Sequence, residues 1–300
     1  MATSLYHWPM KQCAFLTLDE RGDCVIDDEH AIASLEQLGW QVSTLSWRQT
    51  GTPWSDFDVV VVRSTWDYWD DIPAFLETLR QIDSTTRLAN PLDIIHWNLE
   101  KTYMLDLEGK GIGVVPTTWP DAVHPGSFPG FFAELSTGEL VVKPVVGANG
   151  EDAYRVSAGD DLQRLEWICD RFRKKRAMVQ RFMPSILDEG EYSLFYFNGI
   201  FSHAILKIPT GSEFRSQEEH GSEIRPVAPE EKLLLRGQEV LDTLPAIPLY
   251  ARVDFVRDDQ RDFVVMELEL IEPSMYLRTD PEAPGRFARA IDQRFSVSSR

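Results

Sequence analysis

The first 90 residues alternate between short apolar runs and segments whose apolar positions recur at helical spacing. The longest β-branched run, Val59 to Val62, suits a strand that is buried on both faces at the centre of a parallel sheet. Aspartates that precede the periodic segments are typical helix caps. We expect strands at Gln12–Leu18, 40–47, Val59–Val62 and 87–91, and helices from Asp27 or Asp28 to Leu38 and from Asp70 or Asp71 to Leu79. This order predicts an open α/β sheet.

After Asn90 the pattern changes to hairpins and isolated helices, which makes the whole chain α/β in the wider α+β sense. Asn198-Gly199 between two alternating runs predicts a tight hairpin turn. The polar stretch from Thr210 to Pro226 predicts a mobile loop. Helices are expected at Leu99–Glu108, Phe128–Leu135, Asp161–Phe172, Pro229–Leu241 and Pro281–Arg294, and strands before Pro116, on both sides of Gly147–Gly150, from 177 to Pro184, at 191–208 and at 250–271. The ranges 1–90, 91–180 and 181–300 are the predicted domains.

Tyr250 to Met275 contains the densest candidate chemistry in the chain. Two strand-like segments flank a turn. Strand alternation puts Arg252 and Asp254 on the same face of the first segment, and Glu267 and Glu269 on the same face of the second. If the two segments pair, these carboxylates converge, and a buried carboxylate is costly without a partner. Oxygen ligands at this density suit Mg²⁺ or Mn²⁺. The alternative is an exposed acidic strand face on an acidic protein.

Polar residues follow the central strand of the first sheet, at the strand end where ligands bind in open α/β sheets. Arg63 is therefore a candidate for substrate contact, and Trp66 and Trp69 are candidates for the floor of its pocket. A strand-to-helix turn with a capping hydroxyl is the alternative explanation.

Lys143 ends an apolar strand just before the loop Gly147–Gly150. A lysine followed by exposed backbone N–H groups is suited to holding phosphates. The Walker pattern is absent, however, and taken alone this segment favours a hairpin turn beside a surface lysine.

The overall charge narrows the class of partner. A formal net charge of −18 and a pI of about 4.7 argue against nucleic acid and anionic membranes. The three cysteines, with no CxxC pair, indicate reduced thiols and a cytoplasmic protein. The first residues lack a signal-peptide pattern, and no apolar stretch approaches the length of a membrane span.

In combination, these motifs resemble the ATP-grasp superfamily, and most closely the ATP-binding part of prokaryotic glutathione synthetases. The matching segments lie between about residues 90 and 280: NPLDIIHWNLEK, LVVKPVVGANG, MVQRFMPSILDEGEYSLFYFNG, ILKIPTGSEFRSQEEHGSEIRP and RVDFV followed by MELELIEPS. The chain is also similar to the cyclo-ligase type that closes D-cycloserine from an amino-acid precursor. The resemblance implies an N-terminal α/β substrate-side domain at 1–90, a small lobe at 91–180 and a large lobe with the metal site at 181–300, the two lobes gripping the nucleotide.

The resemblance also implies roles for individual residues. Lys101 and Lys143 contact the ATP phosphates, and Glu191, with Glu189 as its alternative, holds the ribose. Lys207 faces the γ-phosphate, Arg215 the acyl phosphate or the substrate carboxylate, and Arg252 the phosphoryl group in transfer. The adenine is bound by Gln180, Arg181, Phe182 and Met183, the two magnesium ions by Asp254, Glu267 and Glu269, and the substrate by Ser274 and Arg278. Glu269 departs from the asparagine that is usual in the family, and Gly147–Gly150 has fewer glycines than usual.

The implied activity is ATP-dependent ligation of a small carboxylate, such as an amino acid or a peptide-like acid, to an amine through an acyl phosphate. The alternatives are intramolecular cyclisation, nucleotide binding without turnover, and phosphotransfer to an acceptor other than a carboxylate. Relatives of this fold often pair, so a homodimer is compatible with the resemblance.

Overall fold

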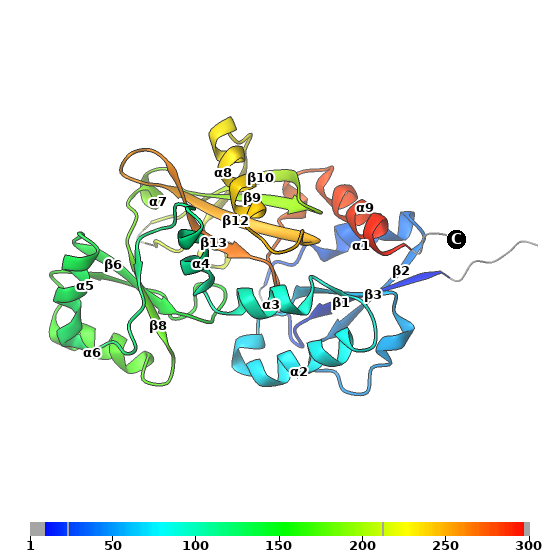
Figure 1. Cartoon of the computed structure of the whole chain (residues 1–300), viewed down its shortest axis with the longest axis horizontal. Helices are drawn as coiled ribbons and strands as arrows, with labels where there is room; N and C mark the ends of the chain where they lie inside the picture. Colours follow the sequence, from blue (N-terminus) through cyan, green and yellow to red (C-terminus); the bar gives the residue numbers. More distant parts are fainter. Residues whose placement is uncertain (1–9, 23, 212, 297–300) are drawn as a thin grey trace, which may run out of the picture.

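The computed structural model describes residues 10–22, 24–211 and 213–296, and it contains three sheets that lie in three parts of the molecule (Figure 1). We call them the N-terminal sheet, in the order β2-β1-β3-β4, the small sheet, in the order β5-β8-β6-β7, and the five-stranded sheet, in the order β11-β10-β9-β12-β13. Residues 1–9, which lack a signal-peptide pattern, lie outside the described part of the chain.

The N-terminal sheet is parallel, as its apolar runs predict. Its strands are β1 (Lys11–Thr17), β2 (Trp40–Ser46), β3 (Val59–Ser64) and β4 (Leu88–Ala89), and its helices are α1 (Asp28–Gln37) and α2 (Ile72–Asp83). Every residue of β3 is buried. Alternate valines of β3 pack on opposite sides, Val59 and Val61 with α1 and Val60 and Val62 with α2. This packing explains the uninterrupted β-branched run.

The small sheet is antiparallel and carries two helices on one face. Its strands are β5 (Thr117–Thr118), β6 (Glu139–Pro144), β7 (Tyr154–Ser157) and β8 (Ala177–Arg181), and its helices are α5 (Phe128–Glu134) and α6 (Leu162–Arg171). Leu140 and Val142 of β6 face these helices, so the intervening residues of the strand, Val141 and Lys143, face the other way.

The five-stranded sheet is antiparallel and lies between the other two parts of the molecule in Figure 1. Its strands are β9 (Glu191–Phe197), β10 (Ile200–Ile208), β11 (Glu223–Pro226), β12 (Tyr250–Arg257) and β13 (Phe263–Glu269), and the helices α7 (Ser185–Asp188) and α8 (Glu231–Asp242) accompany it. The predicted turn between β9 and β10 is confirmed, because Asn198 and Gly199 have φ values of 48° and 76°.

Two short helices, α3 (Leu92–Leu99) and α4 (Tyr103–Gly109), cover the outer edge of β13. The Asn98 amide donates to the Leu268 carbonyl at 2.9 Å and accepts from the Leu270 N–H at 2.8 Å. The Leu268 N–H donates to the Tyr103 hydroxyl at 2.9 Å. These bonds satisfy an edge that would otherwise be unpaired, and they fix the strand that carries Glu267 and Glu269.

Several predicted element bounds were wrong. The helix expected at Leu99–Glu108 begins later, as α4 at Tyr103, because the backbone is extended at Glu100, and the helix α3 before that break was not predicted. The expected loop from Thr210 to Pro226 contains the strand β11, which pairs with β10. The strand expected to end near Pro116 begins after it as β5, and β8 ends at Arg181, ahead of Pro184. Five 3-10 turns complete the described structure: Trp54–Asp56, Tyr68–Asp70, Pro125–Ser127, Glu218–His220 and Leu277–Thr279.

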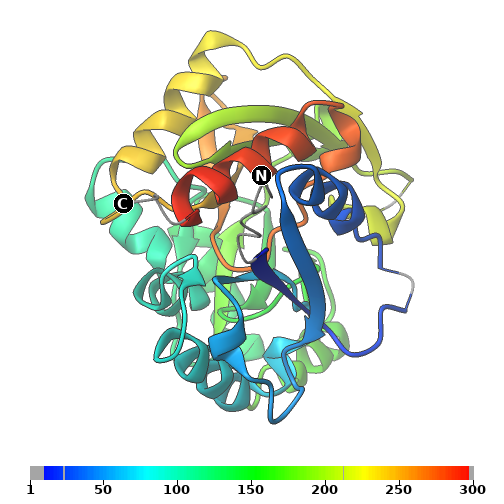
Figure 2. The ribbon, with the colours of Figure 1, turned by 90° about the vertical axis from the view of Figure 1, so that its right-hand side faces the viewer.

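The terminal helix α9 (Ala283–Phe295) returns to the N-terminal sheet, where it packs beside α1 (Figure 2). Phe287 and Ile291 share a core with Phe15 of β1. Residues from both ends of the sequence therefore form one layer. None of the helices in the described ranges combines the length and the apolar character that a membrane crossing needs.

Candidate active site

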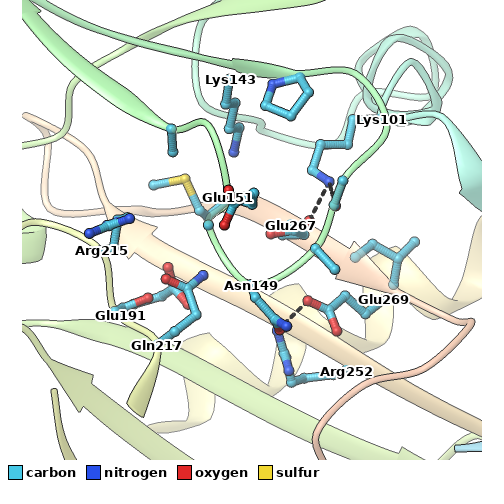
Figure 3. Close-up of a pocket in the computed structure, with 18 of the residues that line it drawn as sticks. Lys101, Lys143, Asn149, Glu151, Glu191, Arg215, Gln217, Arg252, Glu267 and Glu269 are labelled. Carbon is cyan, nitrogen blue, oxygen red and sulfur yellow. Dashed lines mark hydrogen bonds and ion pairs between the residues drawn. The ribbon is translucent and has the colours of Figure 1, made fainter. Parts of the chain in front are cut away.

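A large cavity opens between the small sheet and the five-stranded sheet, and the segment that follows β3 also lines it (Figure 3). The small sheet contributes Lys143 and the start of the loop Gly147–Gly150, and the five-stranded sheet contributes charged residues of β9, β10, β12 and β13. The segment after β3 contributes Trp66 and Tyr68. The sequence analysis made Trp66 and Trp69 candidates for the floor of a pocket. Trp66 lines this cavity, whereas Trp69 does not.

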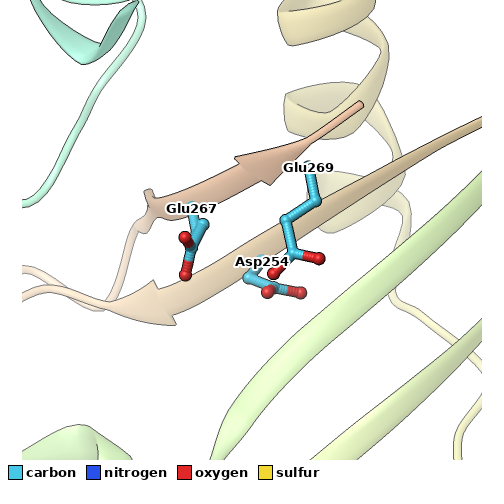
Figure 4. A group of neighbouring side chains, drawn as sticks. All are labelled: Asp254, Glu267 and Glu269. Carbon is cyan, nitrogen blue, oxygen red and sulfur yellow. The ribbon is translucent and has the colours of Figure 1, made fainter. Parts of the chain in front are cut away.

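Three carboxylates meet on the β12–β13 hairpin, as predicted (Figure 4). The register pairs Asp254 with Glu267 and Arg252 with Glu269. One oxygen from each of Asp254, Glu267 and Glu269 lies within 4.8 Å of the others. Three hard oxygen donors at this separation fit a divalent cation such as Mg²⁺.

Each of these carboxylates also has a cationic neighbour. The Lys101 Nζ lies 3.1 Å from Glu267 Oε1. The Arg252 guanidinium contacts Asp254 at 2.9 Å and also binds Glu269. A metal ion bound here would compete with Arg252 for the Glu269 oxygens.

The pKa values show that the neighbouring cations compensate the charges of the carboxylates unequally. Burial raises the pKa of Glu269 to about 8, and Glu267 and Asp254 add to the effect against the opposing charge of Arg252. Burial also acts on Glu267, but Lys101 and Lys143 outweigh it and hold the pKa of Glu267 below its usual value. A cation among the three carboxylates would relieve the repulsion at Glu269.

Lys207 lies almost completely buried between two carboxylates, Glu191 and Asp254. Its Nζ is 3.3 Å from Asp254 Oδ2 and forms an ion pair with Glu191. Burial alone would lower the pKa of Lys207, but the two carboxylates reverse the effect and raise it. The lysine is therefore charged at neutral pH and holds β9, β10 and β12 together.

Lys101 and Lys143 lie on the small-sheet side of the cavity. Lys101 follows α3, and its Nζ donates to the Gly147 carbonyl at 2.7 Å. Burial lowers the pKa of Lys143, although Glu267 opposes this shift. The two lysines with Gly147–Gly150 and residues 180–183 form what we call the lysine side of the cavity.

The loop Gly147–Gly150 has the backbone of a tight turn. Asn149 and Gly150 have φ values of 55° and 65°, and a Cβ on Gly150 would lie 2.9 Å from Gln217 Oε1. Glu151, which follows Gly150, lines the cavity, whereas Asp152 is buried and forms ion pairs with Arg171 and Lys175, at 2.8 and 2.6 Å. Its charge is therefore compensated outside the cavity.

Residues 180–183 line the cavity where β8 ends. The N–H groups of Arg181 and Phe182 donate to the carbonyls of Pro116 and Glu139, at 2.9 and 3.0 Å. The backbone N–H groups of these two residues are thus already bonded inside the small sheet. The Phe182 ring is also stacked by the Arg155 guanidinium, 3.9 Å from the ring centroid.

Asp254 of the carboxylate cluster is buried and is not itself part of the cavity lining, and three further predicted site residues also lie outside it. Arg63 is buried in an ion pair with Asp28 at 2.9 Å, and it also donates to the Pro273 carbonyl. Glu189 binds Arg257 at 3.0 Å. Arg278 bridges Asp27 of the N-terminal layer and Glu218 of the 210–221 segment. The structure does not bring these three to the cavity, whereas Ser274 and Arg215 do line it.

Tyr68 and Glu272 are among the cavity residues that the sequence analysis missed. Glu272 continues the acidic series of β13, but the strand ends at Glu269, so the alternation no longer gives its direction. Its carboxylate forms a hydrogen bond with Tyr68. We call Trp66, Tyr68, Glu272 and Ser274 the Glu272 side of the cavity.

Two family models match the chain. Residues 13–90 match a model described as D-cycloserine synthetase DcsG, N-terminal domain. Residues 130–244 match one described as prokaryotic glutathione synthetase, ATP-grasp domain.

Individual proteins resemble the chain over most of its length. The cycloserine biosynthesis protein DcsG of Streptomyces lavendulae is 30% identical over 86% of this chain and 90% of that protein. The crystal structure of D-cycloserine synthetase DcsG matches with a TM-score of 0.83 and 26% identity, over 95% of this chain and 100% of that one. The D-alanine–D-alanine ligase of Bacillus anthracis has a TM-score of 0.66 at 14% identity, over 94% and 96%, which is a likeness of fold alone.

Proposed function

The chain belongs to the ATP-grasp superfamily and is a ligase that forms C–N bonds, and from this premise we propose that it joins a carboxylate to an amine through an acyl phosphate. ATP is the phosphoryl donor, and an amino acid or a small peptide-like acid supplies the carboxylate. ADP and phosphate leave with the product.

One observation carries this proposal. Lys101 and Lys143 line the same cavity as Glu267 and Glu269, and Asp254 belongs to the same cluster of carboxylates. Phosphoryl transfer depends mainly on positioning and on neutralised charge, which this arrangement supplies. A protein of net charge −18 has no general attraction for ATP, so these local cations matter.

In the proposed reaction, each group of cavity residues has its own role. Lys101 and Lys143 bind the ATP phosphates, and residues 180–183 hold the base, with Glu191 beside the ribose. Asp254, Glu267 and Glu269 would hold Mg²⁺, which neutralises phosphate charge when it is bound. Arg252 and Lys207 stabilise the phosphoryl group in transfer, and Arg215 closes over the acceptor.

The bonds change in two steps. A substrate carboxylate oxygen attacks the γ-phosphorus of ATP, the bond to the β-phosphate oxygen breaks, and ADP leaves. The amine nitrogen then attacks the acyl carbon, phosphate leaves with the carboxylate oxygen, and the nitrogen loses a proton. Exclusion of water by the segment 210–221 protects the acyl phosphate between the steps.

A second candidate is the intramolecular form of the same reaction, in which the amine belongs to the activated amino acid. The similarity to DcsG favours it, because that similarity extends over the substrate-side residues 13–90 as well as the rest of the chain. The chemistry at the metal cluster is identical in the two forms.

The test is ADP release from Mg²⁺-ATP with pools of amino acids and small carboxylates, with and without hydroxylamine. We expect carboxylate-dependent ADP release and a hydroxamate, the product of an acyl phosphate captured by hydroxylamine. A single amino acid that releases ADP without any second amine would favour ring closure. Clear ATP binding without ADP release for any pool would reject the ligase mechanism in favour of nucleotide binding alone.

A further inference from the structure

Among the described residues, the buried carboxylates of the cavity have a cation within ion-pair distance, with Glu272 as the exception. Glu267 has Lys101, and Asp254 has Arg252 and Lys207. Glu272 is only 8% exposed, yet among the described residues no lysine, arginine or histidine nitrogen lies within 4.0 Å of its carboxylate. A carboxylate buried without a cation is costly, so its place here calls for a functional explanation.

The surroundings of Glu272 are rigid and aromatic. The Trp66 indole N–H donates to the Glu272 carbonyl at 2.8 Å, and the Arg63 guanidinium donates to the next carbonyl, that of Pro273, at 3.4 Å. The Tyr68 hydroxyl forms a hydrogen bond with the Glu272 carboxylate. Trp66 and Tyr68 are themselves buried and line the same cavity. The carboxylate is therefore held in one place by the N-terminal layer.

A buried carboxylate beside a tyrosine hydroxyl, in a cavity that an indole also lines, is an environment suited to a small cation. An ammonium group would gain charge-assisted hydrogen bonds from the carboxylate and attraction from the aromatic faces. A second anion, by contrast, would be repelled. Burial raises the pKa of Glu272 to about 7, although Tyr68 and the more distant charges of Lys101 and Arg252 oppose this shift.

We propose that Glu272, with Tyr68 and Trp66, binds the α-ammonium group of the amino acid whose carboxylate is activated. This inference rests on the proposed function, because it places the substrate carboxylate at the metal cluster. In an α-amino acid one carbon separates the ammonium from the carboxylate. Glu272 lies three residues beyond Glu269, so one short segment holds both groups of such a substrate.

The consequence is selection for α-amino acids. A carboxylic acid with a hydroxyl in place of the ammonium would leave Glu272 buried and uncompensated. Sites built around a buried polar group discriminate strongly against analogues that lack its partner. We therefore expect an enzyme that discriminates by charge at carbon 2, with Glu272 as the residue responsible.

The test compares serine with glycerate, which differ only in an ammonium or a hydroxyl at carbon 2. Both enantiomers of each are tested with Mg²⁺-ATP and hydroxylamine, using the full chain and its Glu272→Gln variant. The wild type should favour serine by about 100-fold in kcat/KM, and the variant should reduce this preference to below about 10-fold, with the KM for ATP unchanged. An equal preference in both proteins, or none in the wild type, overturns the inference.

Two further variants separate binding from general effects on the fold. Tyr68→Phe keeps the ring but removes the hydroxyl, and it should raise the KM for serine about 3- to 10-fold with little change in kcat. Glu151→Gln removes a negative charge from the lysine side of the same cavity, and it should leave the preference for serine unchanged. A loss of preference in Glu151→Gln would reveal an effect of net charge and overturn the assignment.

Calorimetric binding of serine in the presence of Mg²⁺ and ADP distinguishes this inference from the proposed function. If neither acid yields ADP or a hydroxamate, serine and glycerate are not substrates of the ligase, and the binding measurement then decides on the ammonium site. Serine binding that is lost in Glu272→Gln would still support the ammonium site, whereas no serine binding to the wild type would overturn it.

Discussion

The lysine side and the Glu272 side of the cavity handle buried charge in opposite ways. Glu267 has Lys101 at 3.1 Å and Lys143 nearby, and its pKa is lowered. Glu272 has a tyrosine hydroxyl as its partner, and its pKa is raised to about 7. The two glutamates stand five positions apart on the same segment.

This contrast indicates which kind of ligand each side of the cavity is suited to bind. A side of the cavity that already carries cationic side chains is suited to bind phosphates and the metal ion that accompanies them. A side that holds an uncompensated carboxylate is prepared for a ligand that carries the missing positive charge. The same substitution, glutamate to glutamine, should therefore change different kinetic constants on the two sides.

Glu267→Gln is expected to have the largest effect. The change removes a metal-binding charge but little volume, so kcat should fall about 1,000-fold while the thermal unfolding temperature stays close to that of the wild type. Steady-state ADP release measures the first quantity and scanning calorimetry the second. Turnover at the wild-type rate would rule out Glu267 as a metal ligand.

Lys207→Met tests whether compensation by cations holds this part of the structure together. The substitution leaves Glu191 and Asp254 buried side by side, so the free energy of unfolding should fall by about 3 kcal/mol. Glu272→Gln is the matched control, because it removes a charge that has no cationic partner and should leave stability unchanged or increase it. Urea denaturation of both variants measures the difference. Equal losses of stability would contradict the contrast between the two sides.

The Arg215→Ala variant tests on which side of the cavity Arg215 acts. Arg215 lines the cavity beside Gly150 and is held by Glu213 at 2.7 Å. If it acts on the acceptor, kcat should fall about 10- to 100-fold with little change in the dissociation constant for ATP. Single-turnover kinetics and ATP calorimetry separate the two. A large loss of ATP affinity would assign Arg215 to the lysine side instead.

His203 is a buried titratable group that does not line the cavity, and it gives the smallest effect. Burial lowers its pKa to about 4. Its Nε2 donates to the Met275 carbonyl at 2.9 Å, so the neutral ring accepts from Ser202 at Nδ1. The unfolded chain gains this proton below about pH 6.5 and the folded chain does not, so stability should fall as the pH falls from about 6.5 towards 4.

The expected loss from His203 is about 1 kcal/mol between pH 7.5 and 5.5. Denaturation of the wild type and of His203→Gln at these two pH values measures it, because the variant should lose less stability than the wild type over the same interval. Identical losses would show that His203 does not set this part of the pH dependence.

The lysine side was largely predictable because its signals are local. The period of two along β12 and β13 places the carboxylates of Asp254, Glu267 and Glu269 together once the two strands pair. Lys143 and its loop also lie within a few residues of each other. By contrast, the helix α3 was missed, because its break at Glu100 depends on packing against the edge of β13 rather than on a proline or glycine signal.

The Glu272 side could not be predicted in this way. Tyr68 and Glu272 are about 200 residues apart, and only the packing of the N-terminal layer on the five-stranded sheet brings them together. Arg63 and Arg278 stand at sequence positions that favour substrate contact. In the structure, however, their guanidinium groups form ion pairs with Asp28 and Asp27 of the same layer. Contacts of this kind follow from tertiary structure, which a local pattern does not contain.

The most direct test of the central claim follows an oxygen atom. The amino acid that supports ADP release is prepared with ¹⁸O in its carboxylate, and the inorganic phosphate formed with Mg²⁺-ATP is examined by ³¹P NMR. An acyl phosphate transfers one carboxylate oxygen to phosphate, so the account predicts one ¹⁸O per phosphate released. Unlabelled phosphate formed at the same rate as product would show that the carboxylate is not phosphorylated, and it would contradict the account.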